Sequence, residues 1–314
     1  MTLLIYDNIY LDHDTGIGHP ENARRIENTI KYLESDNFLA HVTIEKPRAA
    51  SPEEIGLIHP KTYIRTIQQI ANSGGGWLDG DTAVSGPSYN IALYSAGAAL
   101  TAIDLIMKGE AKNAFCLVRP PGHHATPDRG MGFCLFNNVA IAARYLQKNY
   151  QQKRILIIDW DVHHGNGTQD AFYDDPTVMY FSMHRYPFYP GTGAEDETGE
   201  GKGKGFNINI PLSMDTNPQK YIELFSGVIE GSVNRFAPEF IILSSGFDAY
   251  KKDPIGGLNL EIEHFYTLTE IVVEAAEKHC GGKLLSCLEG GYHLSGLPLC
   301  IKAHLKGLLK IKSC

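Results

Sequence analysis

Residues 154–167 read RILIIDWDVHHGNG, an apolar run that gives way abruptly to polar residues. The run Ile155–Ile158 predicts a strand buried on both faces of a parallel sheet. If the extended backbone continues, side chains two residues apart point the same way, which groups Asp159, Asp161 and His163. Two carboxylates and an imidazole at the carboxyl end of a strand indicate a divalent-metal site. For this segment alone, the alternative is a helix N-cap followed by solvated loop histidines.

Length and composition favour one large globular unit. The chain has 314 residues, and no repeat, low-complexity tract or linker divides it, so we predict a single domain over residues 1–314. Hydrophobic residues make up 43% and charged residues 20%, as is ordinary for a soluble protein. A net charge of −8 and a pI near 5.9 argue against a nucleic-acid-binding surface and would help to attract a cationic substrate.

The N-terminal stretch and the cysteines indicate an intracellular, reducing setting. MTLLIYDNIYLDHD has no basic leader, so we expect no signal peptide. No stretch approaches the ~20 apolar residues of a membrane span. The cysteines form no CxxC pair and no disulfide-dense spacing, which predicts buried free thiols in the cytoplasm; they are Cys116, Cys134, Cys280, Cys287, Cys300 and Cys314.

Strand-like and helix-like segments alternate along most of the chain. Apolar runs predict strands at residues 3–7, 114–118, 155–158, 178–184, 206–212, 240–245 and 283–288. Helical spacing and start signals predict helices at residues 22–34, from 52 onward with Pro60 as punctuation, 88–108, 137–150, 217–235, 261–279 and from 297. The glycine run at residues 74–76 is expected to open a loop that ends near Asp81. This alternation predicts an α/β fold with a mostly parallel sheet covered on both faces.

Polar clusters follow four of the predicted strands. They are His123-His124, the group from Asp159 to Asn166, Asp248, and Gly290-Gly291-Tyr292. Because ligands bind at the carboxyl ends of strands in an open parallel sheet, we expect these clusters to converge. Together they would supply metal ligands, proton carriers and a hydroxyl donor.

These residues resemble the histone deacetylase family, in its class II-like branch. The motifs that carry the resemblance occur in the family's order and extend from His19 to Tyr292: RPPGHHAT, GFCLFNNVAIAA, DWDVHHGNGTQ, SMHRYPFYPGTG, GFDAY, DPIGG and LEGGYH. The resemblance implies the three-layer α/β/α arginase–deacetylase fold. It also implies a zinc-dependent amidohydrolase that acts on acyl-lysine proteins or peptides.

The same resemblance assigns the centre of the site. It implies that Asp161, His163 and Asp248 bind one Zn²⁺ per chain, although an Asp/His/Asp set also suits Fe²⁺. A fourth position is left for water and substrate, as in catalytic zinc sites. The resemblance makes His124 the general base and acid, and His123 its companion imidazole.

Three further residues complete the predicted catalytic group. Tyr292 matches the hydroxyl that stabilises the tetrahedral oxyanion. Asp159 matches the carboxylate that orients His123, and Asn166 stands where some branches have a second carboxylate. An amide partner should leave the second histidine less basic, which suits a group that must first accept a proton.

The resemblance also implies a narrow tunnel for an extended lysine side chain. Phe133, next to Gly132, and Tyr189 match its aromatic walls. Ile255 occupies the gate, and Gly291 is expected to contact the substrate.

Other positions are assigned more loosely. Asp81 matches a rim carboxylate that holds the substrate backbone, and a turn residue is the alternative. Ser182 and Met183 resemble part of a structural K⁺ site built from backbone oxygens. The remaining histidines are expected to be structural or superficial: His164 in a structural role, His13 and His19 in a loop at the entrance, and His59, His264, His279 and His304 at helix surfaces or ends.

Four functions compete. The leading one is hydrolysis of an acyl-lysine amide, and the first alternative within the same chemistry is an acetylated polyamine. Ile255 at the gate favours a neutral alkyl chain over a dication. Two-manganese ureohydrolase chemistry needs a carboxylate two residues after the ligand histidine, where this chain has Gly165. A catalytically dead acyl-lysine reader would lack a ligand or the tyrosine, and neither is missing.

Overall fold

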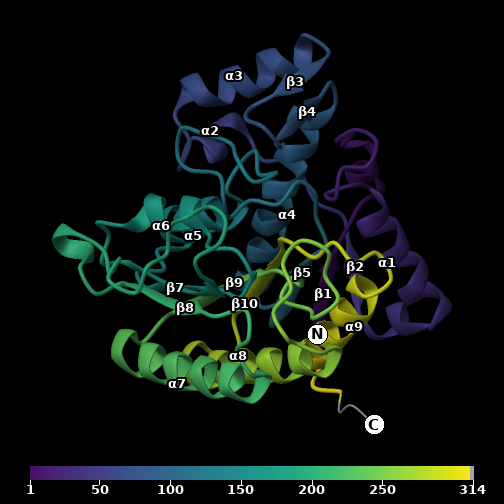
Figure 1. Ribbon diagram of the computed structural model, residues 1–314. Coiled ribbons are helices and arrows are strands. Elements are labelled where there is room, and N and C mark those ends of the chain that lie inside the picture. Colours follow the sequence, from purple (N-terminus) through teal and green to yellow (C-terminus); the bar gives the residue numbers. More distant parts are fainter. Residues whose placement is uncertain (312–314) are drawn as a thin grey trace.

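An eight-stranded parallel sheet runs through the computed structural model, which describes residues 1–311 (Figure 1). Every neighbouring pair of strands in it is parallel. In spatial order the strands are β2 (Thr43–Glu45), β1 (Thr2–Ile5), β5 (Asn113–Cys116), β10 (Leu284–Leu288), β9 (Phe240–Ser245), β6 (Ile155–Asp159), β7 (Val178–Arg185) and β8 (Asn207–Leu212). The predicted α/β class with a parallel central sheet is therefore confirmed.

The central strands are apolar on both sides because both sheet faces are covered. In β6, Ile155 and Ile157 belong to one buried hydrophobic cluster, whereas Leu156 and Ile158 belong to another. Side chains alternate across a strand, so the two clusters are the cores above and below the sheet. An unbroken apolar run is what such a strand requires.

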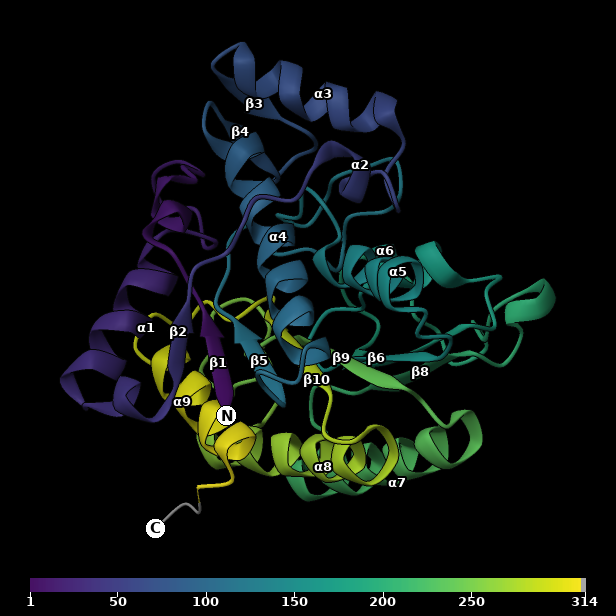
Figure 2. The same cartoon turned by 180° about the vertical axis from the view of Figure 1, so that it is seen from behind.

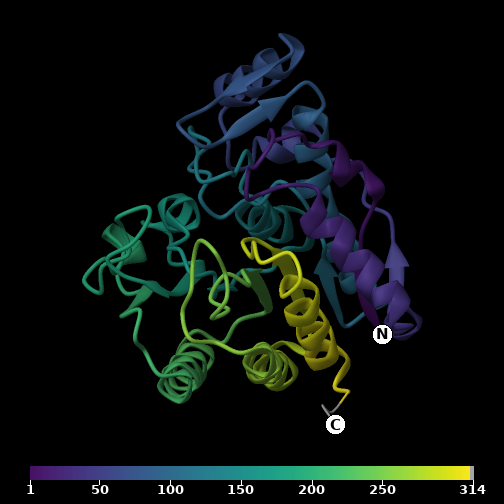
Figure 3. The same ribbon diagram turned by 45° about the vertical axis from the view of Figure 1, so that its right-hand side comes forward.

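Helices form the two outer layers. Figures 1 and 2 show α7 and α8 along one face together with α9 and α1, and α4, α5 and α6 on the other. The bounds are α1 (Arg24–Ser35), α4 (Ser88–Met107), α5 (Asn138–Tyr150), α6 (Asn166–Phe172), α7 (Pro218–Phe236), α8 (Ile262–Cys280) and α9 (Leu297–Leu309). Beyond α4, the helices α2 (Pro52–Ile55) and α3 (Lys61–Asn72) form a projection with a small hairpin, which Figure 3 shows at the top.

Three local predictions need correction. The glycine-rich stretch expected to be a loop contains the antiparallel hairpin β3 (Gly75–Trp77) and β4 (Ala83–Ser85). The elements β2 and α6 lie in segments for which we predicted neither a strand nor a helix. Finally, α4 does reach the length and apolar composition of a membrane span, but most of that stretch is buried inside the fold, as in a core helix.

The histidine and cysteine predictions have mixed outcomes. Five cysteines are free and buried as expected, and Cys314 lies outside the described residues. His59 and His304 are not superficial, because their exposed fractions are 1% and 0%. His304 lies between Thr269 Oγ1 and Ser286 Oγ, at 2.8 and 2.9 Å from its ring nitrogens. His13 is also buried, against Ser88.

His59 joins two loops in its neutral form. Its Nδ1 lies 2.9 Å from the carbonyl of Pro127 and therefore donates, while its Nε2 accepts from the backbone N–H of Asn137, also at 2.9 Å. Burial lowers the pKa of His59 to about 4. A second proton on the ring would break the bond from Asn137.

We predict that acid destabilises the protein partly through His59. The unfolded chain takes up a proton near the ordinary histidine pKa of about 6.5, whereas the folded chain does so only near 4. Between these values the free energy of unfolding should fall with decreasing pH by roughly 1 kcal/mol per unit from this residue. Urea unfolding of His59→Gln, whose amide can make both bonds, should show a shallower pH slope than wild type. Equal slopes would contradict the assignment.

Candidate active site

The polar clusters predicted at the strand ends come together. They follow β5, β10, β9 and β6, which are four adjacent strands in the middle of the sheet. All four strands are parallel, so their carboxyl ends lie along the same edge. Residues that are more than 160 positions apart along the chain, such as His124 and Tyr292, are thereby brought into one site.

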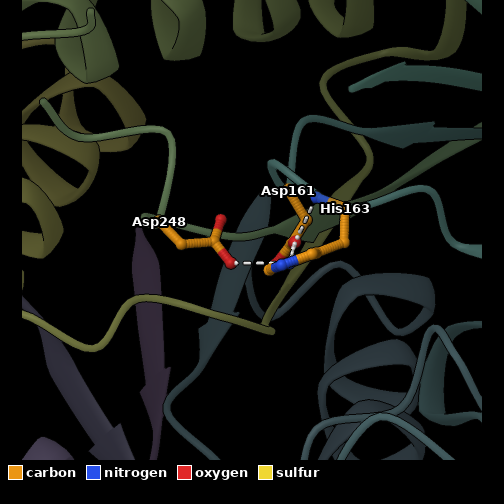
Figure 4. Close-up of side chains that lie close together, drawn as sticks. All are labelled: Asp161, His163 and Asp248. Carbon is orange, nitrogen blue, oxygen red and sulfur yellow. Dashed lines mark hydrogen bonds and ion pairs between the residues drawn. The ribbon is translucent and has the colours of Figure 1, made fainter. Parts of the chain in front are cut away.

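Asp161, His163 and Asp248 form the centre of the site (Figure 4). One ligand atom from each lies within 4.8 Å of the others, and all three side chains are buried. His163 Nδ1 is 3.1 Å from Asp161 Oδ1 and 3.2 Å from Asp248 Oδ2. Asp248 Oδ2 nevertheless makes no hydrogen bond. A buried carboxylate oxygen without a hydrogen bond and a nearby imidazole nitrogen are atoms that a divalent metal could bind, and the metal would satisfy the oxygen.

The electrostatics of the three residues fit a cation as well. Burial, together with the charge of Asp161, raises the pKa of Asp248 to about 7, because two carboxylates are buried close together. A divalent cation would remove that penalty. The oxygens that face away from the centre are held by backbone donors, since Val162 N–H binds Asp248 Oδ1 at 2.9 Å and Gly290 N–H binds Asp161 Oδ2 at 2.8 Å. A side chain at Gly290 would collide with both carboxylates, so only glycine fits there.

His123 is paired with a carboxylate. Its Nδ1 lies 3.0 Å from Asp159 Oδ2, and its Nε2 lies 3.9 Å from Asp161 Oδ1. Burial opposes a charged imidazole, but the carboxylates of Asp159 and Asp161 outweigh it and raise the pKa of His123 to about 10. Tyr180, which the sequence did not point to, donates to the same oxygen of Asp159 at 3.0 Å. These carboxylates therefore favour the protonated form of His123.

His124 has the opposite character. Its ring lies 4.0 Å from that of His123, and its Nδ1 lies 2.9 Å from Asn166 Oδ1. Asn166 presents its oxygen to the ring, so His124 carries its proton on Nδ1 and leaves Nε2 as a free acceptor. Burial, followed by the charges of His123 and His163, lowers the pKa of His124 well below its ordinary value. The pKa values of two consecutive histidines are thus shifted in opposite directions.

A cavity of about 210 Å³ leads to these residues. Its lining contains the tunnel residues expected from sequence, with Phe188 in addition: Asp81, His124, Gly132, Phe133, His163, Phe188, Tyr189, Ile255 and Tyr292. Phe188 stacks on His163 at 5.1 Å and 12°, whereas Tyr189 presents its edge to His124 at 5.1 Å. The sequence reading overlooked Phe188 because its neighbour Tyr189 matched the wall position.

The backbone at the first wall is unusual. Gly132 and Phe133 both have positive φ, 55° and 69°, a conformation that a bulky aromatic residue rarely adopts. Thr82 Oγ1 accepts a hydrogen bond from Phe133 N–H at 3.1 Å, and the Phe133 ring packs edge-on against His19 at 4.7 Å. Strain of this kind persists only where the surroundings enforce it, and it is found mostly at functional sites.

Tyr292 closes the cavity from the opposite side. Its ring meets Phe133 edge-on at 5.8 Å, and its backbone N–H donates to Asp253 Oδ2 at 2.7 Å. Burial raises the pKa of the Tyr292 hydroxyl well above its ordinary value, so it stays protonated and can donate a hydrogen bond. Gly291 is not among the cavity-lining residues, and its carbonyl accepts from Arg25 Nε at 2.7 Å. A substrate contact for Gly291 stays a prediction.

A buried ion cluster behind Tyr292 was also not anticipated. Arg25 lies over the Tyr292 ring at 4.9 Å and pairs with Glu21 at 2.9 Å. Glu21 binds Arg119 as well, at 2.5 Å. Burial opposes its ionisation, yet the two arginines hold the pKa of Glu21 well below its usual range. In sequence, only HPE and RPP hinted at these residues, and neither motif indicates that they meet.

The positions assigned more loosely lie close to the site. Asp81 contributes to the cavity, and its carbonyl lies 3.0 Å from His19 Nε2. His164 is structural as expected, between Thr192 Oγ1 and Gln169 Oε1. Ser182 Oγ lies 2.8 Å from His184 Nδ1, and the K⁺ site inferred for Ser182 stays a prediction.

Known proteins resemble this chain in sequence and in fold. The sequence profile of the histone deacetylase domain matches residues 19–308. The chain belongs to the histone deacetylase family. A probable deacetylase of Archaeoglobus fulgidus is 39% identical over 298 residues, which cover 94% of this chain and 82% of that protein. A histone deacetylase-like amidohydrolase of Pseudomonas aeruginosa is 37% identical over 295 residues, covering 94% and 77%.

A solved structure agrees with these relatives. The crystal structure of the HDA15 HD domain superimposes with a TM-score of 0.93 at 34% identity, covering all of this chain and 90% of that one. The family and the buried Asp–His–Asp triad together make this histone deacetylase family member a metal-dependent amidohydrolase. Its fold is that of the deacetylase domain, as predicted.

We predict that Asp248→Ala loses its metal and its activity together. The two ligands that remain cannot hold a divalent ion tightly, because catalytic sites of this type normally use three protein ligands. Metal content measured by mass spectrometry after desalting should fall by roughly tenfold or more. The exposed Asp215→Ala serves as a control and should keep its metal. Full metal content in Asp248→Ala would disprove the ligand assignment.

Proposed function

We propose that this deacetylase removes acetyl, or other acyl, groups from lysine side chains of proteins or peptides and uses Zn²⁺. The observation that supports this most directly is the lining of the cavity, which combines aromatic side chains with His124 and the triad residue His163. An acyl-lysine presents its amide at the end of four methylene groups, so only a deep channel lets that amide reach a buried metal.

The walls suit an alkyl chain. Phe133, Phe188 and Tyr189 offer ring faces and edges, and Ile255 adds an aliphatic surface. Each methylene that leaves water for such an environment contributes about 0.8 kcal/mol. An acyl-lysine is uncharged at the amide, so burying it avoids the large cost of burying an ammonium.

His124 is the residue best placed to carry the proton. In our proposal its free Nε2 accepts a proton from the attacking water and later gives it to the leaving amine. A pKa held well below its ordinary value keeps the ring neutral until that moment. A divalent metal at the triad supplies Lewis acidity toward the amide carbonyl and the water.

Two other side chains would stabilise charge as it develops. Tyr292 donates its hydroxyl to the oxygen on which negative charge builds up in the tetrahedral state. His123, charged through its pairing with Asp159, adds a fixed positive charge beside the water. Asp159 and Asn166 therefore act through the two histidines, which they orient.

A single metal is the expected number. Ureohydrolase chemistry would require a carboxylate at Gly165, but a side chain there would collide with Asp159, Tyr180 and His123. This crowding opposes the two-manganese alternative independently of the sequence motif.

An acetylated polyamine remains the second candidate substrate. Asp81 contributes a carboxylate to the cavity, and a second ammonium could use it. Ile255 offers no such charge at the gate, and an unpaired ammonium beside an apolar wall is unfavourable. The balance favours the lysine side chain of a peptide.

We predict that Tyr292→Phe slows the chemical step without weakening the binding of the substrate. The ring and its packing against Phe133 remain, but the donor to the oxyanion is lost. The value of kcat should fall by roughly a hundredfold to a thousandfold, with little change in KM or metal content. Turnover close to that of wild type, with metal verified, would show that another group stabilises the oxyanion.

We further predict that an acetyl-lysine peptide exceeds acetylspermidine in kcat/KM, and that Ile255→Glu narrows the difference. The new carboxylate would pair with the second ammonium of the polyamine. This pairing should contribute roughly 1 kcal/mol, which corresponds to about a fivefold increase in kcat/KM for acetylspermidine. Ile255→Gln is the matched control, since it adds a polar side chain of the same size without charge. A wild-type preference for acetylspermidine would favour the polyamine function.

A further inference from the structure

Glu289 is a buried acid next to the site for which the reaction proposed above has no role. It follows β10 directly, and its side chain is 0% exposed. It does not line the substrate cavity. Burying a carboxylate is costly unless several hydrogen bonds satisfy it, so its partners indicate its role.

Those partners belong to two other parts of the site. Glu289 Oε2 accepts hydrogen bonds from the backbone N–H groups of Gly122 and His123, at 2.7 and 3.1 Å. Glu289 Oε1 accepts from Ser244 Oγ at 3.1 Å. Ser244 lies on β9, four residues before the metal ligand Asp248. One side chain therefore ties the histidine turn to the strand that leads to a ligand.

Glu289 is itself held firmly. Its N–H donates to Ser245 O at 3.1 Å, and its carbonyl accepts from Arg25 Nη2 at 2.5 Å. Three residues further along the chain is Tyr292. Glu289 is therefore close in the chain to the proposed oxyanion donor and is bonded to the backbone next to the proposed general base.

We propose that Glu289 is a positioning residue for the deacetylation reaction, which holds the Gly122–His123 backbone so that His124 is aimed at the amide to be cleaved. This inference rests on the function proposed above. In this role the side chain must be long enough to reach both backbone amides and must accept a hydrogen bond from each of them. A displacement of about 1 Å at a reacting group can cost a hundredfold in rate.

Acceptor geometry rather than negative charge is the property that matters. Burial raises the pKa of Glu289 to about 7, which favours the protonated, uncharged form of the side chain. A protonated carboxyl can still accept from both amides through its carbonyl oxygen. An uncharged amide of the same length should do the same.

Two conservative variants separate the alternatives. Glu289→Gln keeps the length and the acceptor and loses the charge, whereas Glu289→Asp keeps the charge and loses the reach. With metal content verified, we expect kcat of Glu289→Asp to fall by roughly tenfold to a hundredfold, while KM and the affinity for a hydroxamate change little. Glu289→Gln should retain kcat within about threefold.

The chain offers a matched control at the opposite end of the sheet. Glu239 precedes β9, and its Oε2 accepts from the consecutive backbone N–H groups of Lys153 and Arg154, before β6. Glu239→Asp and Glu239→Gln change the same kind of contact far from the site. Both should leave kcat within about twofold of wild type.

Hydrogen–deuterium exchange gives a readout that does not depend on turnover. In Glu289→Asp, the amides of Gly122 and His123 should exchange roughly tenfold faster, while in Glu289→Gln they should stay protected. Three results would overturn the inference: wild-type kcat in Glu289→Asp, equal loss in both Glu289 variants, or equal loss in the Glu239 variants. If wild type cleaves no acyl-lysine, the proposed substrate is wrong, whereas the exchange experiment still tests Glu289.

Discussion

The whole site depends on two carboxylates that the sheet forces together. β6 and β9 are neighbours in register, with Asp159 opposite Ser244, so the segments that leave them carry Asp161 and Asp248 to the same point. Two buried carboxylates that lie close together repel each other unless a cation lies between them. The neighbouring backbone groups reduce this cost. Backbone donors satisfy the outward oxygens, and glycine at position 290 gives the space.

A second consequence is the division of labour between the two histidines. They are consecutive in sequence and equally buried, so the difference comes from their partners alone. His123 faces carboxylates, which favour its protonated form, whereas His124 faces the amide of Asn166 and lies beside His123. The charged ring helps to keep its neighbour neutral. The same residue type can therefore serve as a base or as a positive charge. Which of the two is favoured depends on whether its partner is an amide, as for His124, or a carboxylate, as for His123.

Sequence reasoning succeeded where periodicity carries the information. Unbroken apolar runs identified the central strands, and the polar residues just beyond them were rightly expected to converge. The roles of Asp248, His123, His124 and Tyr292 came from the resemblance to the family and not from the periodicity. It failed where distant polar groups meet. The burial of His59 depends on Pro127 and Asn137, which are far along the chain, and nothing around Ile58-His59-Pro60 indicates it. The hairpin β3–β4 was missed because its first strand begins with glycines, which disfavour strands.

The residues proposed to carry out the reaction and those proposed to select the substrate lie in different parts of the fold. The metal ligands and the proposed proton carrier His124 follow strand ends, where the sheet fixes the backbone. The tunnel walls, in contrast, lie in loops, and Phe133 keeps its strained backbone only through contacts such as that with Thr82. A change at a wall such as Ile255 can therefore alter which acyl-amine enters without moving the metal ligands. In this structure the residues proposed to set substrate preference therefore lie in loops, whereas the metal ligands are placed by the ends of the strands.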